Sequence, residues 1–322
     1  MHQTLALAVL LCVGTAPQAP SFAEAPEGKK DKIKVLIVDG QNNHNYKAMT
    51  PFMKEQLEKT DLFTVDVSTT PPAPPRPTKN ETPEQAAERQ KKTDDLKPLW
   101  DQWRPSFKDY KVVLSNYNGE PWPGEVAGAF EEFVKGGGGV YIVHAANNSF
   151  PGWKEYDLMI GLGWRGKEYG SRLFYDETGK LQRSPAGDGP GAGHGAQHEF
   201  KITVRDPDHP ILKGIPPVWL HATDELYHGQ RGPAEKMLIL ASAFDDKSKG
   251  GTGVHEPMMW VIPYGQGKVV TNVMGHENGK SVQCVGFVTL MLRSCEWLAT
   301  GKVTVPVPPN FPTEDKVSLT GK

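Results

Sequence analysis

The chain has 322 residues, of which 38% are hydrophobic and 23% are charged, and its formal net charge is −2. This length and composition are typical of one elaborated globular domain. A charge so close to zero offers no basic footprint for nucleic acid and no polybasic patch for anionic membranes. The charge balance therefore excludes a large polyanionic partner and favours a small or neutral ligand.

The first 23 residues are typical of a secretory signal peptide. Residues 4–14 form an apolar run too short to span a bilayer, and Ser21, Phe22 and Ala23 offer the small residues of a cleavage site, although no Lys or Arg precedes the run. We therefore expect a signal peptide at residues 1–23 and a periplasmic or secreted protein. No later run approaches the length of a membrane span, so no stable membrane insertion is expected.

From residue 32 onward, the chain alternates predicted strands with predicted helices. The strands are KIKVLIVDG, FTVDV, KVVLS and GGVYIV, and the helices lie at residues 47–59 and in GEVAGAFEEFVK. A proline-rich extended linker at residues 69–80 and a solvated helix at residues 82–103, interrupted by Pro98, separate the second strand from the third. Strand and helix repeated in this way predict an α/β domain with a mainly parallel sheet.

The second half of the chain is less regular. Residues 150–197 are rich in Gly and Pro and predict a long loop, which we expect to cover the ligand site. Strands follow in EFKITV, KMLILASA, PMMWVIPYG and GKVVTNVMGH, and a helix is predicted at residues 281–299. This helix contains Cys284 and Cys295, too far apart for a disulfide, so two buried free thiols are expected. Residues 301–322 predict a proline-rich extended tail.

Polar residues gather where the predicted strands end. Ligands of parallel α/β sheets bind outside the carboxyl ends of the strands, so these residues are the first candidates for a site. His44, His144 and His276 each follow a strand. One histidine at a strand end is more often a structural hydrogen-bonding group, but three at the same sheet edge favour a functional site, because imidazole suits proton transfer and metal ligation.

Two further segments carry candidate chemistry. WLHATDELYHG holds His221, Asp224, Glu225 and His228. These residues fit acid–base catalysis or metal ligation, and they fit a capped turn on a polar surface equally well. HGAQH in the glycine-rich stretch contains His198 and a second histidine four residues earlier. That spacing has little meaning for metal ligation outside a helix.

Several motifs together resemble one known family. GQNNHNY, GGGGVYIVHAAN, DPDHPILKGIPPVW, TDELYHG and PMMWVIPYGQGKVVTNVMGH occur in the order seen in the ThuA-like (trehalose-utilisation) family. The resemblance implies a domain at residues 32–300 with the flavodoxin-like fold of class I glutamine amidotransferases, which has helices on both faces of the sheet and long loop insertions. In those amidotransferases a cysteine nucleophile occupies the turn that here carries His144. Cysteine-based amidotransfer is therefore excluded.

The resemblance implies sugar metabolism. We expect an exported carbohydrate-active enzyme that acts on a sugar or keto-glycoside by His/carboxylate acid–base chemistry, as a hydrolase, lyase or isomerase. The expected catalytic residues are His144, Asp224, Glu225 and His276. The expected contacts to a small carbohydrate ligand are Asn43, His44, Asn116, Asn147 and Tyr227.

The cofactor is left open by the sequence, and a divalent metal such as zinc is compatible with these residue types. Its candidate ligands are His144, His198, His221 and His276. The alternative function is a non-catalytic glycan-binding module, which metal content and pH-dependent turnover would distinguish from an enzyme. An amidase or peptidase has no recognisable Ser-His-Asp arrangement here. The oligomeric state is unknown from the sequence.

Overall fold

The computed structural model of the protein describes residue 1, residues 31–277 and residues 279–321. The expected signal peptide lies outside this range apart from Met1. Residues 32–322 form one compact unit. It is built on one large sheet whose strand order is β2-β1-β3-β4-β13-β12-β11-β8-β9.

The first half of the sheet is parallel. It consists of β2 (Phe63–Thr69), β1 (Ile33–Asp39), β3 (Val112–Ser115), β4 (Gly139–Val143) and β13 (Gly267–Asn272). Their short apolar sequences, rich in Val and Ile, suit strands buried on both faces. The expected α/β architecture is confirmed.

The second half of the sheet is antiparallel, and this was not predicted. It consists of β12 (His255–Tyr264), β11 (Leu238–Phe244), β8 (His198–Val204) and β9 (Val218–Asp224). β5 (Arg172–Tyr175) pairs with β12, and β6 (Leu181–Ser184) pairs with β5. The reversal occurs between β12 and β13, which pair Tyr264 with Gly267. The two residues between them allow only a hairpin, because a parallel crossover needs a dozen or more.

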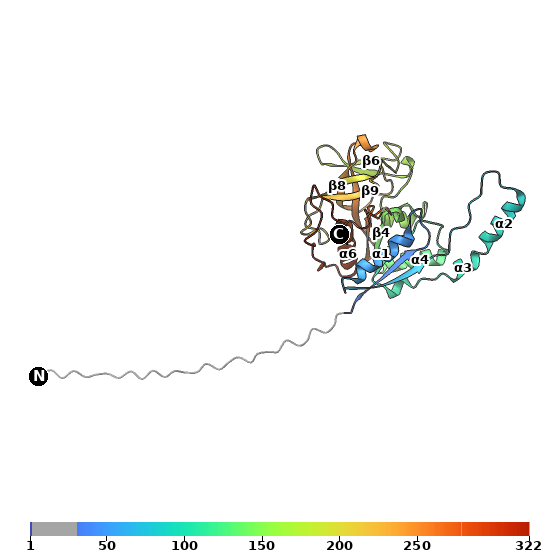
Figure 1. Cartoon of the computed structure of the whole chain (residues 1–322), viewed down its shortest axis with the longest axis horizontal. Helices are drawn as coiled ribbons and strands as arrows, with labels where there is room; N and C mark the ends of the chain where they lie inside the picture. The colour runs from blue at the N-terminus through green and yellow to red at the C-terminus, as the bar shows by residue number, and fades with distance from the viewer. Residues whose placement is uncertain (2–30, 278, 322) are drawn as a thin grey trace. The chain divides into compact units, whose positions relative to one another are not determined.

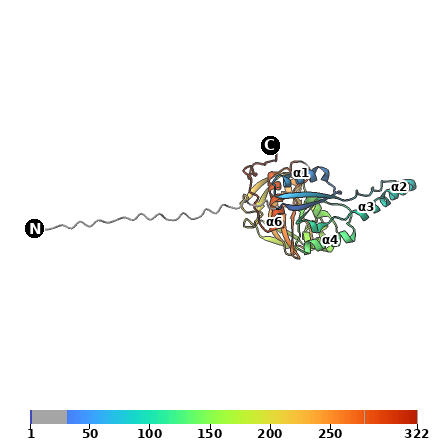
Figure 2. The same cartoon turned by 90° about the horizontal axis from the view of Figure 1, so that it is seen from below.

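Helices cover both faces of the parallel half. In β1, Val35 and Ile37 pack in the same core cluster as α1 (Tyr46–Glu58) and α6 (Val285–Thr300), whereas Leu36 and Val38 pack with α4 (Gly124–Lys135) and α5 (Lys154–Ile160). This alternation follows from the two-residue period of a strand. Figure 2 shows α1 and α4 on opposite sides of the blue strands.

An insertion between β2 and β3 holds α2 (Pro83–Asp94) and α3 (Lys97–Gln102) (Figure 1). Thr82 and Gln85 cap α2 reciprocally, and no residue of α2 is buried, as expected for a solvated helix. The helix expected at residues 82–103 breaks just before Pro98, which occupies the first turn of α3, where its missing N–H costs nothing. Residues 71–78, within the expected linker at residues 69–80, belong to no helix or strand.

Residues 150–197 are not one structureless loop, and that expectation is wrong. They contain α5, β5, β6 and β7 (Gly193–His194), which pairs with β10 (Tyr227–His228). The fully buried Arg231 holds the segment down by donating to the carbonyls of Gly170, Pro185 and Pro190. A distant arginine thus supplies the hydrogen bonds that the Gly- and Pro-rich sequence lacks locally.

Short 3₁₀ helices complete the fold; they are η1 (Phe107–Asp109), η2 (His144–Asn148), η3 (Lys167–Tyr169) and η4 (Lys247–Lys249). The helix predicted to start at residue 281 begins at Val285, and Cys284 is its N-cap residue. Cys284 and Cys295 are buried and unpaired, as expected. Among the described residues, no helix combines the length and apolarity needed to cross a membrane.

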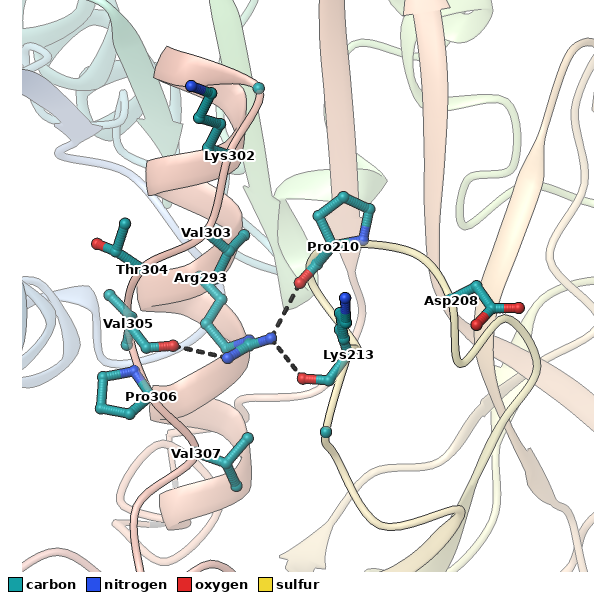
Figure 3. A pocket seen from close by; sticks show the side chains of 12 residues that line it. Asp208, Pro210, Lys213, Arg293, Lys302, Val303, Thr304, Val305, Pro306 and Val307 are labelled. Carbon is teal, nitrogen blue, oxygen red and sulfur yellow. Dashed lines mark hydrogen bonds between the residues drawn. The ribbon is translucent and has the colours of Figure 1, made fainter. Parts of the chain in front are cut away.

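Arg293 of α6 is one of the residues that hold the C-terminal tail to the domain. Arg293 donates to the carbonyls of Val305 at 2.6 Å, Pro210 at 2.9 Å and Lys213 at 2.8 Å, beside a cleft of about 790 Å³ (Figure 3). It also donates to the carbonyl of Ile211 at 2.6 Å and is only 5% exposed. All its bonds go to main-chain oxygens, so it stabilises two loops through their backbone.

We predict that Arg293→Ala lowers the free energy of unfolding by about 2–4 kcal/mol, because it leaves several buried carbonyls without donors. Chemical denaturation with urea measures the change. Lys302→Ala, an exposed neighbour in the same cleft, is the control and should change stability by less than about 0.5 kcal/mol. Equal effects of the two substitutions would contradict the role assigned to Arg293.

Candidate functional site

Three histidines and one glutamate from four chain segments meet at one edge of the sheet. His44 lies in the loop after β1, His144 is the first residue of η2 after β4, Glu225 directly follows β9, and His276 follows β13. One nitrogen or oxygen of each side chain lies within 4.8 Å of those of the others. We call these four residues the histidine–glutamate cluster.

His144 occupies a strained turn. Its φ is +42°, in the left-handed region that residues other than glycine seldom adopt, and its side chain is fully buried. Its Nδ1 lies 2.7 Å from the carbonyl oxygen of Val273, which can only accept, so Nδ1 carries the hydrogen. In the neutral ring the lone pair is then on Nε2, which faces the Tyr227 hydroxyl at 3.0 Å and Glu225 at 3.5 Å.

Glu225 is surrounded by imidazoles. Its Oε2 lies 3.5 Å from Nε2 of His144, and its Oε1 lies 3.4 Å from Nε2 of His276 and 3.5 Å from Nε2 of His194. Burial alone would raise the pKa of this carboxyl group. The hydrogen bond and positive charge available from His144, with the charges of His276 and His194, outweigh burial and lower the pKa to about 2.

Asp224 connects the two chain segments that carry Glu225 and His276. Its fully buried carboxylate accepts hydrogen bonds from the backbone N–H groups of Glu225 at 2.7 Å, Gly275 at 2.8 Å and His276 at 3.2 Å. It also pairs with Nε2 of His221 at 2.7 Å. Burial would raise the pKa of Asp224, but the contact with His221 outweighs it and lowers the pKa. Asp224 therefore positions Glu225 and His276 through their backbone N–H groups.

Gly275 makes room for this arrangement. Its φ is +103°, and a Cβ atom there would lie 2.6 Å from the ring of Phe287. Only glycine lets the chain turn between α6 and the carboxylate of Asp224 and bring His276 to the cluster.

His44 completes the cluster. Its ring centroid lies 4.8 Å from that of His144 and 4.6 Å from that of His276. Burial, and then the charges of His144 and His276, lower the pKa of His44 to about 4, so this ring is neutral near pH 7. Burial also lowers the pKa of His276. Histidine binds metal ions through a neutral imidazole, which is the form of His44 near pH 7.

The donor set fits a divalent transition-metal ion. Ligand atoms roughly 2.1 Å from a tetrahedral ion lie roughly 3.4 Å from one another, close to the separations of Glu225 from His144 and His276 of 3.5 and 3.4 Å. His144 donates its other ring N–H to a backbone carbonyl, as metal-bound histidines usually do. Nδ1 of His276 is buried and has no hydrogen-bond partner within the described chain.

Aromatic and imidazole side chains form a wall beside the cluster. The Trp164 ring lies 4.6 Å from that of Tyr227 and 5.8 Å from that of His194, measured between centroids. His194 belongs to β7, and its side chain remains 35% exposed. The segment expected to cover the ligand site thus contributes two side chains to its wall.

The structure separates the remaining candidates into two groups. Tyr227 touches His144, and the exposed Asn43 lies with Nδ2 3.0 Å from Nε2 of His44. Asn116 and Asn147 are fully buried, and their amides donate to Thr50 and to the carbonyl of Leu162, so both brace the loops. Neither residue belongs to the histidine–glutamate cluster.

His198 and His221, expected as candidate metal ligands, lie outside the cluster. His221 is fully buried and its Nε2 is engaged by Asp224, so it supports the cluster through that carboxylate. Burial would lower the pKa of His221, but the neighbouring Cys284 and Asp224 outweigh it and raise the pKa to about 9. Nδ1 of His198 lies 2.7 Å from the carbonyl oxygen of Ala196, and its ring packs on Phe200.

The role of two residues was not apparent from the sequence. His44 was expected to contact substrate, but it lies close enough to His144 and His276 to bind the same metal ion. His194 was not expected to lie beside Glu225. His44 follows a strand, as His144 and His276 do, so treating the three alike would have placed it in the cluster. His194 has no comparable signal, because β7 is two residues long and pairs with a distant segment.

The fold and the site place the protein among α/β proteins whose polar site lies at the carboxyl edge of the parallel strands. The family model ThuA, described as trehalose utilisation, matches residues 34–298. The chain belongs to the ThuA family, which supports a carbohydrate-related role.

Solved structures agree with this assignment. A ThuA-like protein from Parabacteroides merdae is 37% identical, with a TM-score of 0.78, over 90% of this chain and 98% of the other. A second, from Bacteroides uniformis, is 17% identical with a TM-score of 0.50, over 88% of this chain and 96% of the other, and shows the fold alone. No curated protein matches the chain significantly.

We predict that the purified protein binds one divalent ion such as Zn²⁺ per chain. Glu225→Gln should weaken binding by at least about 10- to 100-fold, because that is the loss caused by removing a residue that only hydrogen-bonds to a metal ligand. Affinity should fall with decreasing pH, because protons compete for the imidazoles. Elemental analysis and competition with a chelating dye measure both. His198→Ala is the control. A protein that binds no ion, or equal losses in the two variants, would contradict the cluster as a metal site.

Proposed function

We propose that the protein is an exported carbohydrate-active enzyme that acts on a sugar or keto-glycoside at the histidine–glutamate cluster. The observation that carries the proposal is the meeting of His44, His144, Glu225 and His276 within 4.8 Å. Membership of a family described as trehalose utilisation supports the substrate class.

The cluster combines metal ligands with groups able to move protons. A divalent ion bound there would polarise a sugar oxygen, a carbonyl oxygen above all. Tyr227 has its hydroxyl 3.0 Å from His144 and lies in the site wall, so it can orient the same oxygen. The His194 side chain lies next to Glu225 and is 35% exposed, so it can exchange a proton with substrate or solvent.

Within this proposal the four expected catalytic residues have different tasks. His144, Glu225 and His276 face the reacting atoms or the ion. Asp224 acts through its neighbours, because its oxygens already accept three backbone N–H groups and pair with His221. Asp224 is thus a positioning residue, and its loss should displace Glu225 and His276 together.

We predict that His144→Ala and Glu225→Gln each lower turnover by about 100-fold or more, the range for loss of a general acid or base. Plain and 3-keto glycosides form the substrate screen, and circular dichroism checks folding. Lys201→Ala, on the exposed side of β8, is the control.

Turnover that survives both substitutions would contradict the assigned roles. Sugar binding without turnover of any glycoside by the metal-loaded wild type would instead favour the glycan-binding module.

We also propose export, from the apolar run at residues 4–14 and the small residues that end at Ala23. The expected mature chain begins just after Ala23. Intact-mass spectrometry of protein recovered from the periplasm or medium measures this. A cytoplasmic protein that retains Met1 would refute it.

A further inference from the structure

A second polar groove begins beside the histidine–glutamate cluster. It has a volume of about 790 Å³ and lies between the loop after β1, the proline segment 72–77, the loop 118–120 after β3, and one face of α2. This volume suits a ligand the size of one or two sugar rings. We call it the insertion groove, because α2 and the proline segment belong to the insertion between β2 and β3.

The insertion groove is contiguous with the cluster through one asparagine. Asn43 lines the groove, and its Nδ2 lies 3.0 Å from Nε2 of His44. Its Oδ1 accepts a hydrogen bond of 2.6 Å from Nδ2 of Asn118, another lining residue. Asn43 therefore lies between the groove and the cluster.

Buried contacts hold the walls of the groove together. The Gln41 side chain is 5% exposed, donates to the carbonyl of Pro71 at 2.8 Å and accepts from the N–H of Glu120 at 2.9 Å. It thereby ties the start of the proline segment to the loop after β3. A Cβ atom on Gly119 would lie 2.3 Å from Oε1 of Gln41, so this contact requires glycine. The buried amide of Gln41 thus holds two walls of the groove in place.

The lining favours an uncharged polyhydroxylated ligand. The lining carries the amides of Asn42, Asn118 and Gln90, the hydroxyl of Thr93 and the apolar C–H surface of the prolines. Gln90 donates to Asp94 at 3.1 Å and Thr93 donates to the carbonyl of Arg89 at 3.0 Å, so both offer a ligand their oxygen atoms as acceptors. Sugar rings present the same combination of hydroxyls and apolar faces. The charged lining residues are of both signs, and Arg89 is already paired with Glu81 at 2.9 Å. This balance disfavours a polyanion.

We propose that the insertion groove binds the second sugar of an uncharged glycoside whose first sugar lies at the cluster. The inference rests on the proposed function for the identity of the first subsite. It makes the natural substrate a disaccharide or a longer glycoside and assigns α2 and the proline segment to substrate selection.

Calorimetric titration of the full chain tests this proposal by binding alone. The probes are methyl α- and β-glucopyranoside as one-sugar ligands, and trehalose, maltose and cellobiose as two-sugar ligands. At least one disaccharide should bind about tenfold more tightly than the methyl glycosides, the gain expected from one or two added hydrogen bonds. The double substitution Gln90→Ala/Thr93→Ala should reduce this preference to about twofold or less. Folding should be preserved, since no residue of α2 is buried.

Lys91→Ala, on the same helix but outside the groove lining, is the matched control and should keep the preference. Disaccharides that bind no more tightly than the methyl glycosides, or a preference that survives the double substitution, would overturn the proposal. So would an equal loss in Lys91→Ala. Because no turnover is measured, a protein that prefers disaccharides through Gln90 and Thr93 but converts no glycoside would refute only the proposed enzyme.

Discussion

The site depends on one buried carboxylate. Asp224 ends β9, in the antiparallel half of the sheet, and accepts the backbone N–H groups of Gly275 and His276, which follow β13 in the parallel half. These bonds set the distance between Glu225 and His276, and the pairing with His221 offsets the cost of burying the charge. Without these hydrogen bonds, no contact of Asp224 would join the two halves of the sheet at the cluster. The distance between Glu225 and His276 would then change with each movement of the loops that carry them.

The fold creates the cluster by turning the sheet around at one point. Parallel strands deliver His44, His144 and His276 to their common carboxyl edge, as open α/β sheets do for their ligands. The carboxylate comes from elsewhere, because β12 reverses direction and the strands beyond it bring β9 back to that edge. Imidazoles therefore come from the parallel half and the acidic group from its antiparallel extension.

Local patterns were sufficient for the parallel half and for the histidines, because short apolar runs and strand-end positions are readable one segment at a time. They failed where a distant partner determines the structure. β9 was not predicted, since His221 and Asp224 look polar in the sequence and are buried only because they pair. Likewise β5, β6 and β7 lie in a stretch whose carbonyls are satisfied by the remote Arg231. The hydrogen bonds between Asp224 and the loop after β13 cannot be predicted from the sequence of either segment alone.

The scatter of the cluster along the chain has a thermodynamic consequence. Its members come from the first strand of the domain to the last, so the donor atoms converge only after the whole sheet has formed. An ion held by them binds the folded chain and has no comparable site on the unfolded one. At a free concentration 100 times its dissociation constant, such an ion adds about 2.7 kcal/mol to the stability of the entire domain. The same few side chains would then link the availability of metal in the surroundings to the lifetime of the protein.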